Sequence, residues 1–252
     1  MAYTAVKMPY QLSANLPKIL TTTNKNMNKI GLVGGISWTS TLDYYKFINE
    51  GVNAKLGGLN FAECMIYSLN FGDIYTQSWD NSYDLLLNAC ENLKKSGADG
   101  IALCANTAHL YADRLQQEVN LPVIHIVTET AKAINKNGFR KIGLLGTKFT
   151  MEMDFYRNKF ELFGLEVLIP EKPETREYIQ YTLREELGVG LINPETKEKY
   201  KEIVKDLVDR GAECIVLGCT EIPMLVSQDD FEIPVLDTTK IHSQAIVEFI
   251  TA

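Results

Sequence analysis

The segment Ile215-Val-Leu-Gly-Cys-Thr-Glu-Ile-Pro223 combines a short apolar run with a turn of small and polar residues. The earlier segment Gly97-Ala-Asp-Gly-Ile-Ala-Leu-Cys-Ala-Asn-Thr107 has the same pattern. Each predicts a buried strand, a tight turn and the first turn of a helix, with Thr or Asn available as a cap. Cys219 would then lie where helix amides stabilise its thiolate, so we expect a pKa below the unperturbed ~8.5. A buried structural cysteine is the competing interpretation.

Composition and charge exclude several classes of partner. The chain has 252 residues, 46% of them hydrophobic, which is enough for one large core or two smaller ones. The net charge is −7 with acids and bases interspersed, so no basic face favours nucleic acid. No apolar run approaches the ~20 residues of a membrane span and no signal peptide is evident, so we expect no membrane association.

The cysteines indicate the redox environment. The chain has 5 of them, and an odd number argues against a disulfide framework. Their positions match no metal-ligand spacing, so we expect no bound metal. A reducing cytoplasm fits this pattern best. The cysteines are Cys64, Cys90, Cys104, Cys214 and Cys219.

The order of elements indicates an α/β protein. Residues 1–26 lack a helical or strand period, which favours an extension outside the fold. From there on, apolar strands alternate with helices, as in a parallel sheet covered on both faces. The first strand, residues 29–33, leads into Gly34-Gly35, a turn that lets backbone approach a ligand but lacks the third glycine of a dinucleotide-binding fingerprint. Residues 70–81 are expected to form a polar loop.

Three segments recur later in the chain, after 112 to 114 residues. Repetition at a nearly constant interval indicates two similar halves. We therefore predict two pseudosymmetric, doubly wound parallel-sheet domains with the active site in the cleft between them, where strand-end turns meet. The predicted domains are residues 27–127 plus 239–252, and residues 128–238. The repeated pairs are 29–34 with 141–146, 97–103 with 211–217, and 121–125 with 233–237.

Acid and base groups on facing turns suit inversion of a carbon centre, because one side removes a proton and the other returns one to the opposite face. Five motifs bear on this chemistry: Gly34-Gly35-Ile-Ser-Trp-x-Ser-Thr-x-x-Tyr-Tyr45, Asn106-Thr107-Ala-His109, Gly146-Thr-Lys-x-Thr-Met-Glu152, Asp154-Phe-Tyr156 and Gly218-Cys-Thr-Glu221. Together they resemble the aspartate/glutamate racemase family from about residue 27 to the end. The resemblance implies an amino-acid racemase that needs no pyridoxal phosphate or other cofactor. It also implies a homodimer, with an amino acid or dicarboxylic acid bound between the two domains of a chain.

The match to the family's two catalytic cysteines is uneven. Cys219 occupies the position of the second one, between Gly and Thr. The first normally precedes Asn-Thr directly, where this chain has Ala105, and Cys104 comes one residue too early. In an extended segment a shift of one residue points a side chain to the other face. Three possibilities stay open: Cys104 reaches the site through a distorted turn, water replaces it, or two-base racemisation is weak or absent.

Other site residues follow from the resemblance. Asn106, Thr107 and Thr220, with the turn amides and beside Ala105, would hold the substrate α-carboxylate, although helix capping alone explains these residue types equally well. Ser37 and Gln77 would line the cleft. Arg176 would bind a side-chain carboxylate, because the segment after the second strand has no base.

Two other functions remain open. The missing thiol at Ala105 favours one-base chemistry of the kind found in related decarboxylases and isomerases. A catalytically weak protein that binds the substrate is the remaining alternative. One-base action would exchange the proton on the substrate carbon with retention of configuration, and a binding protein would not exchange it.

Overall fold

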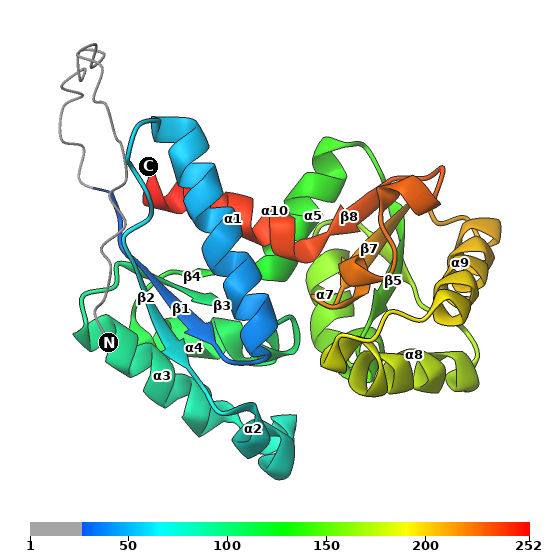
Figure 1. The fold of residues 1–252 in the computed structure, drawn as a ribbon, viewed down its shortest axis with the longest axis horizontal. Helices are drawn as coiled ribbons and strands as arrows, with labels where there is room; N and C mark the ends of the chain where they lie inside the picture. Colours follow the sequence, from blue (N-terminus) through cyan, green and yellow to red (C-terminus); the bar gives the residue numbers. More distant parts are fainter. Residues whose placement is uncertain (1–26) are drawn as a thin grey trace, which may run out of the picture.

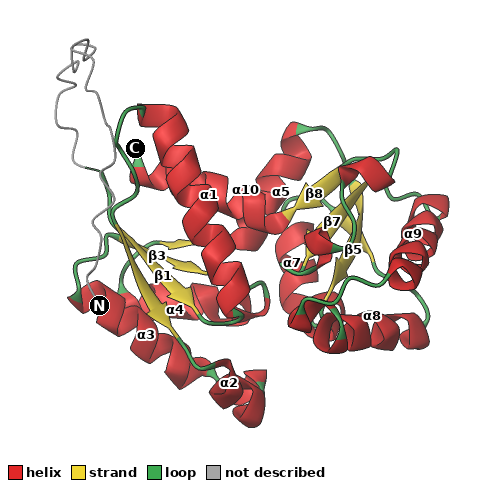
Figure 2. Cartoon of the chain, viewed as in Figure 1, coloured by secondary structure: helices red, strands yellow, loops and turns green. Residues whose placement is uncertain are grey.

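The computed structural model describes residues 27–252 (Figure 1), and the extension predicted at residues 1–26 lies outside the described residues. Two four-stranded sheets, each entirely parallel, form the centre of two halves. Helices cover both faces of each sheet (Figure 2). The predicted fold class, two doubly wound α/β domains, is confirmed. None of the helices within residues 27–252 has the length and apolar character needed to cross a membrane.

The two sheets have the same topology. The first has the order β2-β1-β3-β4 and the second the order β6-β5-β7-β8, so each element of one sheet has a counterpart in the other. The central strands are buried on both faces, which explains their continuous apolar character. The strands are β1 (Ile30–Gly34), β2 (Cys64–Ser68), β3 (Gly100–Leu103), β4 (Val123–Ile124), β5 (Lys141–Gly146), β6 (Glu166–Leu168), β7 (Cys214–Gly218) and β8 (Val235–Asp237).

The helices alternate with the strands, as the sequence predicts. Several begin at side-chain caps: Asn193 accepts a hydrogen bond at the start of α9, and Asp237 accepts two at the start of α10. The predicted loop at residues 70–81 is wrong, because that segment forms α2 and a 3₁₀ turn. The helices are α1 (Trp38–Leu56), α2 (Phe71–Gln77), α3 (Tyr83–Lys95), α4 (Ala112–Val119), α5 (Ile126–Lys136), α6 (Lys148–Glu152), α7 (Asp154–Glu161), α8 (Pro173–Glu185), α9 (Pro194–Asp209) and α10 (Thr238–Ile250).

Two helices connect the halves. The buried side chains of α5 pack with strands β5 and β7 in the second half. Those of α10 pack with α1 and strands β1 and β3 in the first half. The two helices also contact each other, as Figure 1 shows at the centre of the molecule. The chain therefore passes from the first half to the second at α5 and returns at α10. The domain boundaries assigned from the sequence stay a prediction.

The turn after β1 requires glycine at one position. Gly35 has φ +84°, and a Cβ there would lie 2.1 Å from the carbonyl oxygen of Leu69. The amide of Gly35 donates a 2.9 Å hydrogen bond to the hydroxyl of Thr41. The turn thus passes directly against the end of β2, where only glycine fits.

The variant Gly35→Ala should lower the melting temperature far more than Gly138→Ala does. Gly138 has a similar φ of +81°, but no heavy atom lies within 4 Å of the position that a Cβ would take there. The variant Gly138→Ala should therefore lose only about 1–2 kcal/mol of stability, the cost of a left-handed backbone conformation. Gly35→Ala adds the clash with Leu69 and should cost about 3 kcal/mol or more. Equal melting temperatures for the two variants, measured by calorimetry, would contradict this account of the turn.

Candidate active site

A cavity of about 550 Å³ lies between the two halves. Its floor consists of the segments that follow the carboxyl ends of β1, β3, β5 and β7. Ligands of open parallel sheets bind at these ends, because the turns there expose backbone amides and short side chains. The predicted meeting of strand-end turns therefore occurs in the structure.

Cys219 and Glu221 form the polar centre of the cavity. The half-buried Cys219 follows the last residue of β7, and its Sγ donates a 2.9 Å hydrogen bond to Oε2 of Glu221. The same oxygen accepts a 2.8 Å hydrogen bond from Thr220. The other carboxylate oxygen accepts a 3.1 Å hydrogen bond from Ser37, which belongs to the first half. Glu221 therefore joins the two sides of the cavity. Ser37 and Thr220 both line the cavity.

The surroundings of Cys219 raise the pKa of its thiol well above the ordinary value. Burial is the main cause, and the charge and the hydrogen bond of Glu221 act in the same direction. The backbone amides of Thr220 and Glu221 lower the pKa, but by less. The expectation of a lowered pKa is therefore wrong, because burial and a carboxylate two residues away outweigh the turn amides. The thiol is protonated at neutral pH.

Ala105 and Cys104 point to different environments. Ala105 lines the cavity. Cys104 has no exposed surface and packs in the first half beside Tyr44 and Ile246, where burial raises its thiol pKa. The structure thus places Cys104 in the core of the first half and not in the cavity with Cys219. Ala105 and Cys104 belong to different core clusters, as the alternation of side chains along an extended segment requires.

The side chain of Asn106 is committed to the protein. Its carbonyl oxygen accepts a hydrogen bond from the buried hydroxyl of Tyr156, and its amide donates one of 3.2 Å to Thr238. Tyr156 lies on α7 and Thr238 is the first residue of α10, so Asn106 ties the turn after β3 to both helices. The hydroxyl of Thr107 lies 3.4 Å from that of Thr147, and both residues line the cavity.

All 3 histidines of the chain pack together behind this turn. The ring centroid of His109 lies 5.1 Å from that of His125 and 5.3 Å from that of His242. His109 also contacts the carbonyl oxygen of Ala105 through Nδ1, at 3.0 Å. Burial lowers the three pKa values to about 4, about 2 and about 3, respectively, so the rings are neutral. None of the three lines the cavity that contains Cys219, and the cluster supports the turn from behind.

Two predicted residues lie outside the cavity. Gln77, at the end of α2, is exposed. Arg176, on α8, binds the carboxylate of Glu152 at 2.7 Å and the carbonyl oxygens of residues 170 and 171. Arg184, two turns further along α8, lines the cavity instead. Sequence reasoning missed Arg184. The prediction that Arg176 faces the cleft could have pointed to it, because positions eight residues apart lie on a similar side of a helix.

Aromatic side chains form much of the remaining wall. They come from helices that surround the turns. Sequence reasoning missed the three from residues 70–81 because that segment was predicted to be a polar loop, and it gave the other two no role in the cavity. The frequency of aromatics in that segment is the signal that could have found them. These residues are Trp38, Phe71, Tyr75, Trp79 and Phe149.

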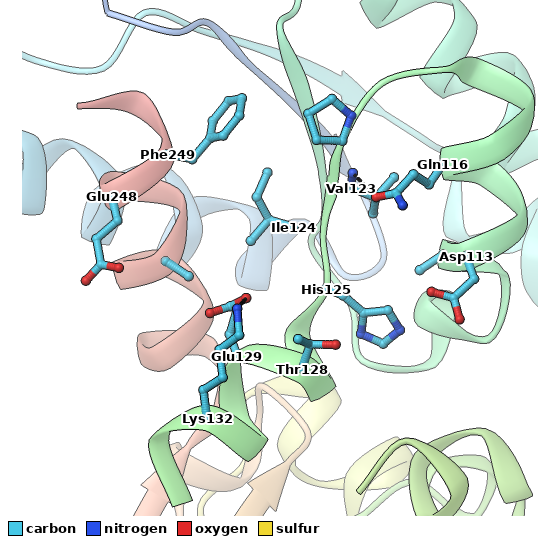
Figure 3. Close-up of a pocket in the computed structure, with 13 residues that line it drawn as sticks. Asp113, Gln116, Val123, Ile124, His125, Thr128, Glu129, Lys132, Glu248 and Phe249 are labelled. Atoms are coloured by element: carbon cyan, nitrogen blue, oxygen red, sulfur yellow. Dashed lines mark hydrogen bonds and ion pairs between the residues drawn. The ribbon is translucent and has the colours of Figure 1, made fainter. Parts of the chain in front are cut away.

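A second cavity, of about 430 Å³, lies between α4, α5 and α10. Figure 3 shows its lining, in which His125 and Asp113 lie on one side and Glu248 and Phe249 on the other. Several ionised groups are paired within the protein: Lys132 binds Glu129 at 2.8 Å, and Asp113 binds Lys159. No thiol lines this cavity among the residues that the structure describes. Within residues 27–252, no group of three or more His, Cys, Asp or Glu side chains is placed to hold a metal ion.

Comparison with known proteins shows the family of this chain. The chain is 25% identical to the broad specificity amino-acid racemase RacX of Bacillus subtilis, over 86% of this chain and 96% of that one. It is 30% identical to a glutamate racemase of Persephonella marina, over 69% and 70%. The solved structure of an aspartate racemase homologue from Pyrococcus horikoshii is 38% identical with a TM-score of 0.79, covering 90% of this chain and 100% of that one. The family model for Asp/Glu/hydantoin racemases matches residues 33–246. The chain belongs to the Asp/Glu/hydantoin racemase family.

Proposed function

We propose that this protein is an amino-acid racemase, independent of pyridoxal phosphate, that uses Cys219 as an acid/base at the substrate Cα. The observation that carries the proposal is the thiol of Cys219 at a strand-end turn, 2.9 Å from the carboxylate of Glu221, in a cavity between two similar halves. Membership of the family and the racemase names of its relatives support it.

The turns can hold the substrate α-carboxylate. The segments around Thr107 and Thr220 line the cavity, and the hydroxyls and backbone amides of such turns can stabilise an anion. When Cα loses its proton, negative charge spreads onto this carboxylate, so the same donors stabilise the carbanion. Asn106 contributes by positioning its turn through Tyr156 and Thr238.

Cys219 and Glu221 can act together in proton transfer. The thiol proton lies on the hydrogen bond to Glu221, so the carboxylate can accept it and leave a thiolate. The thiolate then takes the Cα proton: the C–H bond breaks, an S–H bond forms, and the electron pair remains on the substrate. In the reverse sense, the protonated thiol donates directly to the carbanion.

The opposite face of the substrate would meet Ala105, which has no proton to exchange. Inversion at Cα then needs a proton from water on that face. This observation also favours a second candidate function, one-base chemistry in which Cys219 removes and returns a proton on the same face. The two differ in stereochemistry.

We also propose that the enzyme works as a homodimer in a reducing cytoplasm. All five cysteines are free thiols, as expected where disulfides do not form. The dimer follows from the resemblance to the family.

Enantiopure amino acids incubated with the protein in deuterium oxide should gain deuterium at Cα with inversion. Cys219→Ala should reduce this exchange by ~10²–10⁴-fold, because the proton acceptor has no replacement. Cys90→Ala, which removes a thiol buried in the first half, should keep the activity and lose on the order of 1 kcal/mol of stability. Exchange with retention would instead establish one-base chemistry, and unchanged exchange in Cys219→Ala would refute the role of this thiol.

Removing the charge of Glu221 should lower the pKa of Cys219. In Glu221→Gln the repulsion between carboxylate and thiolate is absent, so the thiolate should form at lower pH. The rate of alkylation at Cys219, followed against pH by mass spectrometry of its peptide, should rise at a lower pH than in the parent. Glu232→Gln serves as a control for charge removal at an exposed site. A curve that stays in place in Glu221→Gln would rule out this electrostatic coupling.

A thiol at position 105 should strengthen racemisation. Ala105→Cys places a second acid/base group in the cavity at little extra volume, and one such group is typically worth ~10²–10⁴-fold. Cys104→Ala should leave the rate unchanged, because Cys104 is in the core. Polarimetry or chiral chromatography measures both. If Cys104→Ala abolished racemisation and Ala105→Cys added nothing, Cys104 would be the second base after all.

A further inference from the structure

The helical wall of the active-site cavity is apolar over most of its lining. Five aromatic side chains from α1, α2, the 3₁₀ turn after α2 and α6 face the cavity, together with Ile74. Two of the five, Trp38 and Tyr75, are 66% and 68% exposed. Large aromatic rings left exposed singly are common on a surface, but several gathered around one concavity indicate an apolar binding surface.

Charged groups in the cavity are few and already engaged. Among the cavity-lining residues that the structure describes, only Arg184 and Glu221 carry a charge. Glu221 accepts hydrogen bonds from three side chains. The guanidinium of Arg184 forms an ion pair with the adjacent Glu185, and its side chain is 56% exposed.

An acidic substrate side chain would find little to bind it. Ion pairs at exposed sites contribute weakly, because water screens both partners, and Arg184 would also have to give up Glu185. Arg176 is committed to Glu152 and two carbonyl groups outside the cavity. A cationic side chain would meet the positive charge of Arg184 beside the aromatic rings. An uncharged side chain avoids both penalties.

The size of the cavity points the same way. Its volume of about 550 Å³ lies within the ~300–1,000 Å³ of pockets that bury drug-sized ligands. A short carboxylate side chain would leave the aromatic wall in water. A bulky apolar side chain would cover it, and the release of water from these rings would favour binding.

We propose that the side-chain subsite of this enzyme is the aromatic wall formed by Trp38, Phe71, Tyr75, Trp79 and Phe149, and that the substrate class is α-amino acids with bulky uncharged apolar side chains. This assignment of substrate rests on the proposed racemase function. The α-carboxylate and Cα remain at the turns beside Cys219, and the side chain extends toward α2 and α6.

The test compares leucine, phenylalanine, aspartate, glutamate and lysine, each as a pure enantiomer, with the full-length protein. Two readouts are taken for each: deuterium entry at Cα in deuterium oxide, and saturable binding by calorimetry. We expect kcat/KM for leucine or phenylalanine to exceed that for aspartate and glutamate by at least about tenfold, with the same order in binding. Faster exchange of aspartate, glutamate or lysine would overturn the subsite while leaving a racemase.

The binding readout separates this proposal from the proposed function. Preferential binding of leucine and phenylalanine without any exchange would support the subsite and refute the racemase activity. Absence of both binding and exchange for leucine and phenylalanine would overturn the subsite.

Variants locate the subsite. Tyr75→Ala and Phe149→Ala, from opposite halves of the molecule, should each raise KM for phenylalanine by about tenfold or more while changing kcat less. Tyr181→Ala is the matched control: it removes a ring that is 52% exposed on α8 and does not line the cavity. Equal KM values in Tyr75→Ala, Phe149→Ala and Tyr181→Ala would refute the aromatic wall as a subsite, provided that circular dichroism shows all three folded.

Discussion

The structure depends on the burial of two parallel sheets on both faces. A parallel strand must be followed by a crossover, so every strand of each half delivers its carboxyl end to the same edge. Helices α5 and α10 cross between the halves and contact each other, which fixes how those edges approach. The cavity forms where the two edges meet, and its polar floor is therefore built from turns while its wall is built from helices.

Within that cavity one carboxylate organises the chemistry. Glu221 accepts hydrogen bonds from Cys219 and Thr220 on its own turn, and from Ser37 on the other half. It helps to keep the thiol protonated in the free protein and provides the acceptor through which a thiolate can form. The turn amides are present, as the strand-turn-helix pattern predicts, but burial and the nearby negative charge outweigh them.

The two halves share a backbone plan and differ in the chemistry of their turns. The turn after β7 has a thiol, whereas the equivalent turn after β3 presents the methyl group of Ala105. Behind Ala105, neutral histidines and the hydrogen-bonded side chain of Asn106 hold this turn in place. The thiol of Cys219 thus has no counterpart at the equivalent position of the other turn, which makes the stereochemistry of proton exchange the informative measurement.

The sequence alone determined the alternating elements, the internal repeat and the one-residue register that separates Ala105 from Cys104, because periodicity and local turn geometry are short-range properties. Only the tertiary structure decided the pKa of Cys219, the exclusion of Gln77 and the exchange of Arg176 for Arg184 in the cavity. The physical reason is that the burial of Cys219 and the partners of Arg176 depend on neighbours distant in the chain. Arg176 and Arg184 lie on the same helix. Arg176 binds Glu152 outside the cavity, whereas Arg184 lines the cavity between the two halves.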